Sequence, residues 1–224
     1  MSKIVEDEKA YESFNQDPTK NLQKQNNNLV KECKKRIHSI KQSIVRYSAP
    51  KGEIRDENIN LEDISFDGIY EGAYVKNGLG QLIDGLYGDD DYQKQLQGEN
   101  SGTRWVGWSN GTRGGEPVDL TFEFRGIREF HAVHLHCNNM FTRGVQVFSQ
   151  AEILFSLDGE RYQASSVHAM IPIDLTRESA RNITIKLHGR PAKFMKLRLT
   201  FTNKWMLISE ISFESGKHKH LIIN

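Results

Sequence analysis

The segment Gly78-Leu79-Gly80-Gln81-Leu82-Ile83-Asp84-Gly85 places an amide and a carboxylate three residues apart between glycines. Glycine lets the backbone bend closely around a small ion, and the oxygens of Gln81 and Asp84 are ligands that calcium accepts. A phosphate-binding loop is excluded, because the segment lacks the third glycine of a dinucleotide fingerprint and the Gly-Lys-Ser/Thr ending of a P-loop. A cation site and a simple turn remain as alternatives.

Two other groups of residues could bind metals. Asp89-Asp90-Asp91 lacks the alternation and the distal glutamate of an EF-hand, so we interpret it as a solvated acidic turn. His134 and His136 share one face of a predicted strand, and His131 lies nearby, but no further pair of ligands completes a tetrahedral zinc site. We interpret these residues as solvent-facing strand histidines.

The sequence shows no constellation typical of an enzyme. There is no Gly-x-Ser-x-Gly element for a nucleophile, and acidic pairs such as Glu152 and Asp158 are expected on any sandwich surface. We therefore predict a non-catalytic protein.

Two tripeptides, Asn110-Gly111-Thr112 and Asn182-Ile183-Thr184, match the acceptor pattern for N-linked glycans. Because Asn110 lies in a polar, glycine-rich loop and Asn182 begins a predicted strand, we expect Asn110 to be the more accessible. The polar start of the sequence does not resemble a signal peptide, and no apolar run reaches the length of a membrane span.

Charge is spread unevenly along the 224 residues. Residues 1–46 hold ten Lys and Arg against six Asp and Glu, which leaves 20 against 23 for the remainder. A mildly acidic main domain lacks the basic face that nucleic acid requires, so we expect no nucleic-acid binding. Cys33 and Cys137 are far apart in sequence and do not indicate a disulfide framework, and we expect Cys137 to be a buried thiol.

The first 46 residues differ in pattern from the rest. Residues 1–20 are polar and indicate a disordered tail. In residues 21–46 the apolar positions recur at spacings of three and four, which predicts a basic amphipathic helix. This helix could dock on its own domain or form a short coiled-coil seam. A membrane-surface helix is a weaker alternative, because the stripe lacks Trp, Phe and Leu.

From Tyr47 onward the hydrophobic period changes to two. Apolar and polar residues alternate in six runs: 118–124, 133–137, 153–157, 183–187, 195–201 and 207–213. Turn sequences such as Asp158-Gly159 and Gly189-Arg190 separate some of them, and no helical run intervenes. The pattern predicts an all-β fold, an antiparallel sandwich with an α-helical extension at its N-terminus.

Several segments together resemble one family: "YSAPKG", "FDG", "NGLGQLIDGLYGDDDY", "WVGWSNGT", "FEFRGIREF", "HCNNMFTRGV" and "WMLISEISFES". They are similar to the discoidin domain receptors, collagen-activated receptor tyrosine kinases, and in particular to the membrane-nearer of their two extracellular discoidin domains. The resemblance covers residues 47–215 and leaves 216–224 as a C-terminal tail. It implies a discoidin-type jelly roll, in agreement with the strand pattern.

The resemblance also implies a buried Ca²⁺. The ligand positions fall on the side chains of Gln81, Asp84 and Glu210, the carbonyl groups of Thr103, Trp105 and Ser209, and the side chain of Glu62, where the family usually has Asn. All of these donors are oxygens, as calcium requires. We expect this ion to have a structural role, connecting an early segment of the domain to a late one.

The sequence departs from the family in several ways. Two cysteines that pair across neighbouring strands in the family correspond to Ile153 and Leu197, so a whole bridge is replaced by apolar residues. Residues 21–46 stand where the collagen-binding domain is expected, and no signal peptide, membrane span or kinase domain is recognised. Direct collagen contact by this chain is therefore not expected.

The resemblance predicts a non-catalytic, calcium-stabilised extracellular module of a collagen-receptor tyrosine kinase. Such a module would position a ligand-binding domain at the plasma membrane, as a glycoprotein that reaches collagen through the parent receptor; dimer formation is left open. The alternative is a stand-alone discoidin-type module that binds carbohydrate or protein, since a fold alone does not determine function.

Overall fold

The computed structural model describes residues 43–94 and 102–217. In chain order the elements are β1 (Ile44–Pro50), β2 (Ile54–Arg55), β3 (Ile59–Asn60), β4 (Ile69–Glu71), β5 (Tyr74–Gly78), the 3₁₀ helix η1 (Gln81–Ile83), β6 (Val106–Ser109), β7 (Val118–Cys137), the 3₁₀ helix η2 (Phe141–Arg143), β8 (Gln150–Ser156), β9 (Val167–Met170), β10 (Arg181–Thr200) and β11 (Trp205–Lys217). The named strands pair antiparallel wherever they adjoin, so the predicted all-β class is confirmed.

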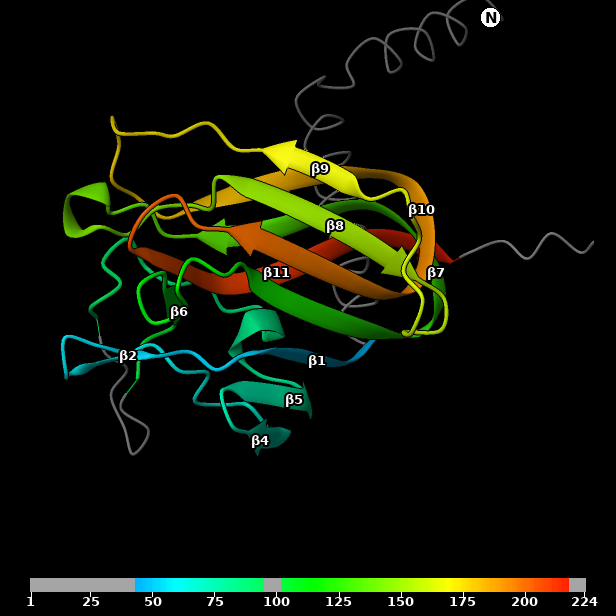
Figure 1. Cartoon of the computed structure of the whole chain (residues 1–224), viewed down its shortest axis with the longest axis horizontal. Helices are drawn as coiled ribbons and strands as arrows, with labels where there is room; N and C mark the ends of the chain where they lie inside the picture. Colours follow the sequence, from blue (N-terminus) through cyan, green and yellow to red (C-terminus); the bar gives the residue numbers. More distant parts are fainter. Residues whose placement is uncertain (1–42, 95–101, 218–224) are drawn as a thin grey trace, which may run out of the picture. The chain divides into compact units, whose positions relative to one another are not determined.

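The long strand β7 belongs to both layers of the sandwich. Its first half pairs with β1, its second half pairs with β11, and β10 follows it along both halves (Figure 1). The rings of Phe124 and Phe130, from the two halves, lie 4.6 Å apart between centroids. Such contact across six residues requires β7 to bend, so that its two halves face each other across the core.

Aromatic residues fill the space between the layers. Phe213 of β11 contacts Phe122, Phe124 and Phe130, with ring centroids 5.1, 5.2 and 6.0 Å away. All four rings are buried, with exposures of 0% or 1%. Alternation of apolar and polar residues brings these rings to the inner faces, where their burial stabilises the sandwich.

The positions that correspond to the family disulfide lie directly opposite each other. Leu197 of β10 pairs with Ile153 of β8, and both side chains are fully buried. Apolar packing therefore occupies the place that the resemblance assigns to a bridge. Cys137 is a buried free thiol, as predicted.

Both predicted boundaries of the domain need correction. Ile44, Val45 and Arg46 belong to β1, not to a helix, because the backbone pairs with β7 and the side chain of Ile44 is buried in the core. At the other end β11 continues through Gly216 and Lys217, which were predicted to be tail. The rest of the predicted helix and the tail of residues 1–20 lie outside the described residues.

Candidate metal centre

The glycines of the opening segment bring chain segments into close contact. Gly80 has an extended backbone, with φ −175°, so any residue could adopt its conformation. A Cβ atom there would lie only 2.4 Å from Asp63 Oδ2 and 2.6 Å from the Tyr47 hydroxyl oxygen. Gly80 is therefore required by close packing, and it allows η1 to lie against the segment around Asp63.

Gln81 connects three segments of the chain. Its Oε1 accepts a 2.9 Å hydrogen bond from the Ile64 backbone N–H, and its Nε2 donates a 2.8 Å bond to the Thr103 carbonyl oxygen. Both Gln81 and Thr103 are buried. The structure thus brings two of the predicted ligand residues into direct contact.

Glu210 reaches the same region from β11, which packs against η1. Its side chain is buried, and Oε2 accepts a 2.7 Å hydrogen bond from the backbone N–H of Gly85. Asp84 precedes Gly85, and its Oδ1 accepts a 2.7 Å bond from the Leu86 N–H. Two predicted carboxylate ligands therefore accept hydrogen bonds from consecutive backbone N–H groups.

Ser209 and Trp105 lie beside this cluster. Ser209 Oγ accepts a 3.0 Å hydrogen bond from the Gly88 N–H and bonds His136 Nδ1 at 2.7 Å. The Trp105 ring stacks on the His136 imidazole, with centroids 5.3 Å apart. Thr103 Oγ1 donates a 3.2 Å bond to the Trp105 carbonyl oxygen, which links the two predicted carbonyl ligands.

Glu62 makes a different contact. Its carboxylate pairs with the Lys51 ammonium group at 2.9 Å, and its side chain is 29% exposed. The structure therefore does not bring the carboxylate of Glu62 to those of Asp84 and Glu210, and its assignment as a ligand stays a prediction.

Asp63 is a buried carboxylate that was not predicted from the sequence. Its Oδ1 accepts hydrogen bonds from the backbone N–H groups of Gln81 (2.9 Å) and Ser65 (3.3 Å), and its Oδ2 accepts the Tyr47 hydroxyl hydrogen. Burial, followed by the neighbouring charge of Asp63, raises the pKa of the Tyr47 phenol well above its ordinary value, so Tyr47 remains a donor. The Asp63-Ile64-Ser65 sequence, which is typical of an Asx turn, was the available signal.

The histidines differ in environment. His134 bonds Thr184 Oγ1 through Nδ1 and Glu214 through Nε2, at 2.9 and 3.1 Å, near the surface as predicted. His136 is half-buried under Trp105 and Tyr87, so the prediction of a solvent-facing side chain is wrong for this residue. Burial lowers the pKa of His136. Within residues 43–94 and 102–217, no three His, Cys, Asp or Glu side chains form a metal-binding group.

The predicted order of accessibility of the two glycan acceptors is also wrong. Asn182 is exposed, whereas Asn110 is only partly exposed and its Oδ1 atom is buried. The loop after Asn110 folds back, because Thr112 Oγ1 donates a 2.7 Å hydrogen bond to Glu53. Alternation leaves Asn182 on the outer face of β10, which the sequence pattern could have indicated.

A family model described as "Discoidin domain-containing receptor 1/2, DS-like domain" matches residues 43–215. The chain belongs to this family. Human epithelial discoidin domain-containing receptor 1 is 35% identical to this DS-like domain over 176 residues, which are 77% of this chain and 19% of that protein. Discoidin domain-containing receptor tyrosine kinase B of Caenorhabditis elegans is 32% identical over 185 residues, 81% of this chain and 22% of that protein.

The DS-like chain thus spans about a fifth of the length of these relatives. The matched part is a discoidin-like domain and not a catalytic one, and no kinase domain lies within the 224 residues. None of the helices in the described part has the length and hydrophobicity of a membrane span.

Solved structures with low sequence identity also resemble this DS-like domain. CBM32-3 from a family 31 glycoside hydrolase of Clostridium perfringens is 15% identical, covers 79% of this chain and 94% of its own, and has a TM-score of 0.48. CpGH89CBM32-5 of the same organism, in complex with GalNAc-β-1,3-galactose, is 13% identical, with coverages of 76% and 99% and a TM-score of 0.46.

The donors gathered around η1 suit a hard cation. They are amide, carboxylate and carbonyl oxygens, without sulfur or imidazole, and the Thr103 and Trp105 carbonyl oxygens each have a second lone pair beside the hydrogen bond from a side chain. The carboxylate of Glu210 is buried beside the Asp84–Gly85 peptide. The donor atoms are thus of the kind that calcium takes, and the assignment of Gln81, Asp84 and Glu210 as side-chain ligands stays a prediction.

Proposed function

We propose that this DS-like domain is a non-catalytic, calcium-stabilised extracellular module of a collagen-receptor-like tyrosine kinase. It positions a ligand-binding domain and transmits the orientation of that domain toward the plasma membrane. Collagen binds through the parent receptor, not through this chain. Asn182 and Asn110 accept glycans when the protein passes through the secretory pathway.

The observation that carries this proposal is the meeting of three distant segments at η1. Gln81 bonds the Thr103 carbonyl group, and Glu210 bonds the Gly85 N–H. A rigid connection between an early and a late part of the domain suits a module that transmits orientation. A flexible connection would not keep the two parts in a fixed relative orientation.

In this proposal Gln81, Asp84 and Glu210 hold Ca²⁺ together with the carbonyl groups of Thr103, Trp105 and Ser209. The ion supplies positive charge that offsets repulsion between the two carboxylates. The protein contributes burial and pre-set orientation: hydrogen bonds from Gly85 and Leu86 hold the carboxylates of Glu210 and Asp84 in place.

Isothermal titration of the chain with CaCl₂, after removal of bound metal, tests the proposal. We expect one site in the unchanged chain and at least tenfold weaker binding in Glu210→Gln, which keeps the side-chain shape and removes its charge. Asp89→Asn is the matched control, since Asp89 is exposed and pairs with Lys94 at 2.6 Å. No calcium binding by the unchanged chain, or equal binding by Glu210→Gln, contradicts the proposal.

A second experiment tests the receptor role. Joined to a collagen-binding discoidin domain, a membrane span and a kinase domain, this module should support collagen-dependent tyrosine phosphorylation in cells. The Glu210→Gln module should lower that response while leaving collagen binding at the cell surface unchanged. An unchanged response would show that the calcium site does not serve signalling.

A further inference from the structure

A cavity of about 280 Å³ lies where the loops after β7 and β9 meet the start of β10. We call it the Gln146 pocket; its lining includes Asn139, Gln146, Val147, Ile171, Ile173 and Ile183. None of the residues proposed to hold calcium contributes to it. Its size is close to the lower limit for small-ligand sites, which suits one side chain of a larger partner.

The Gln146 pocket contains polar groups without partners. Gln146 is only 6% exposed and Asn139 only 2%. Asn139 Nδ2 donates to the carbonyl oxygens of Asp174 and Arg177, both at 3.0 Å. Among the described residues, the Gln146 amide and the Asn139 Oδ1 atom make no hydrogen bond. A ligand that supplies both a donor and an acceptor would satisfy them, as a peptide group does.

The lining of the pocket is aliphatic in part, and it also includes the polar residues Asp174, Arg181 and Thr202. Val147, Ile171 and Ile183 line it, and no aromatic ring is present against which a sugar could stack. Ile173, which lines the pocket, is 64% exposed, and its neighbours in the sequence Met170 and Leu175 are 73% and 60% exposed. These are the largest exposures of bulky apolar side chains in the described part of the chain. An exposed isoleucine beside the aliphatic part of the lining offers apolar surface that a partner can cover.

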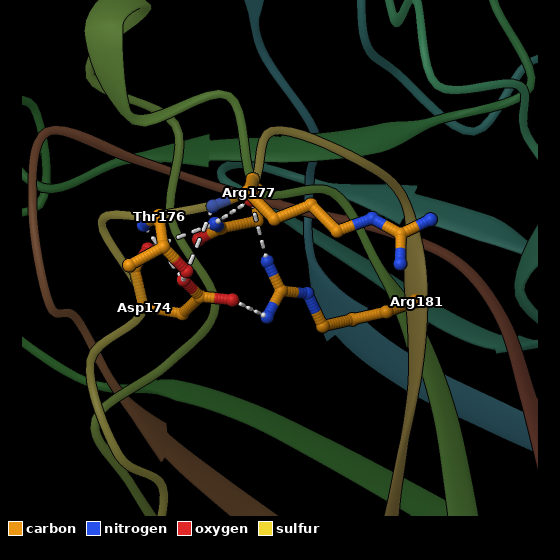
Figure 2. Close-up of polar contacts among 5 residues, drawn as sticks. Asp174, Thr176, Arg177 and Arg181 are labelled. Atoms are coloured by element: carbon orange, nitrogen blue, oxygen red, sulfur yellow. Dashed lines mark hydrogen bonds and ion pairs between the residues drawn. The ribbon is translucent and has the colours of Figure 1, made fainter.

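The loop of residues 171–180, between β9 and β10, contributes to the lining of the pocket, and we call it the rim loop. Hydrogen bonds hold this loop in a fixed shape. Figure 2 shows the Asp174 carboxylate accepting from the backbone N–H of Thr176 (2.8 Å) and of Arg177 (3.2 Å), and pairing with Arg181. Arg181 Nη2 also donates a 2.9 Å bond to the Arg177 carbonyl oxygen. The backbone that carries Ile173 and Leu175 is therefore pre-organised, which reduces the backbone entropy lost on binding.

The strand that leads into this loop offers an open edge. β9 (Val167–Met170) ends the strand order β4-β5-β1-β7-β10-β8-β9, and among the described strands it pairs with β8 alone. Its outer backbone groups are available to an added strand, the mode by which many domains bind extended peptides.

We propose that the Gln146 pocket and the β9 edge bind an extended peptide segment of a protein partner. One aliphatic side chain of the peptide enters the pocket, and its adjacent peptide groups pair with Gln146 and Asn139. This site extends beyond the proposed structural role of the domain and does not depend on calcium.

Side-chain amide signals of the isotope-labelled 224-residue chain, followed by NMR, test the proposal. The probes are N-acetyl-Gly-Leu-Gly amide, the same peptide with Ser in place of Leu, and methyl β-galactoside. We expect the leucine peptide to shift the Gln146 and Asn139 signals and to bind at least tenfold more tightly than the serine peptide. Gln146→Leu and Ile173→Ser should each weaken binding at least threefold.

Matched controls are Gln163→Leu, on a different loop, and Leu157→Ser, which changes an apolar side chain that is 51% exposed elsewhere. Ile173→Ser keeps the test valid even if Gln146→Leu fails to fold, because Ile173 is largely exposed. The proposal is overturned if the leucine peptide shifts neither amide, if the galactoside binds there instead, or if the controls weaken binding equally.

Discussion

The Oε2 atom of Glu210 accepts a 2.7 Å hydrogen bond from the backbone N–H of Gly85, a residue 125 positions earlier in the chain. The bond connects β11 to the end of η1, and the glutamate that makes it is buried. A contact between such distant positions closes a long loop, so it contributes to stability only after most of the sandwich has formed.

Gly80→Ala should destabilise the domain by about 1–3 kcal/mol, because the new methyl group would overlap the Asp63 carboxylate and the Tyr47 hydroxyl group. The measurement is the free energy of unfolding in urea. Gly126→Ala is the control: no atom lies within 4 Å of a Cβ there, so a change within about 0.5 kcal/mol is expected. Equal losses for both variants would contradict the packing argument.

Tyr47→Phe should lower the free energy of unfolding by about 1–3 kcal/mol, because buried Asp63 loses the hydrogen bond from the phenol. Tyr74→Phe removes a hydroxyl group from a side chain that is 48% exposed and should have almost no effect. Denaturant titration of the two variants compares them directly. A Tyr47→Phe protein as stable as the parent would show that the bond does not stabilise the fold.

The double variant Ile153→Cys, Leu197→Cys should form a disulfide and gain about 2–4 kcal/mol of stability, since the two positions pair directly across β8 and β10. Mass spectrometry detects the bridge, and unfolding with and without reductant measures its effect. Each single variant is a control that cannot form this bridge. A reduced double variant under oxidising conditions would contradict the strand register.

Hydrogen bonds from Thr176, and then from Arg181 and Arg177, hold the pKa of the Asp174 carboxyl group well below its ordinary value of 3.8. A carboxyl group whose pKa is lowered on folding stabilises the folded state above its ordinary pKa and loses this contribution as pH falls below it. The rim loop should therefore stay ordered at pH 4 and loosen only at lower pH.

The amide NMR signals of Thr176 and Arg177, followed from pH 6 downward, test this expectation. Their titration midpoint should lie below 3.8, and Asp174→Asn should abolish the titration. A midpoint at or above 3.8 in the unchanged chain would show that these hydrogen bonds do not favour the charged carboxylate.

The alternation of apolar residues was enough to predict the sandwich and the long strands β7, β8, β10 and β11, but not the shorter strands β1 to β6 and β9. It could not show that β7 is one continuous strand, because residues 125–127 are exposed where it bends and interrupt the pattern. Ile44 fitted a helical stripe equally well, and the pairing with β7 decided its conformation.

The candidate site was predicted in part. Gln81 came from the glycine-bounded segment itself, Thr103 and Glu210 came from the resemblance, and the structure brings all three to the ends of η1. Asp63 was missed because its role depends on contacts with Tyr47 and Gln81, which local sequence does not reveal. The pairing of Glu62 with Lys51 likewise depends on tertiary structure.

The most direct test of the calcium-stabilised fold is the Tm of the metal-free chain with and without CaCl₂. At a calcium concentration of 100 times Kd, binding to the folded state adds about 2.7 kcal/mol. For a domain of this size, that corresponds to a rise in Tm of about 5–10 °C. We predict this rise, its reversal by EDTA, and its loss in Asp84→Ala but not in Asp89→Ala. The same Tm in calcium and in EDTA would contradict the account.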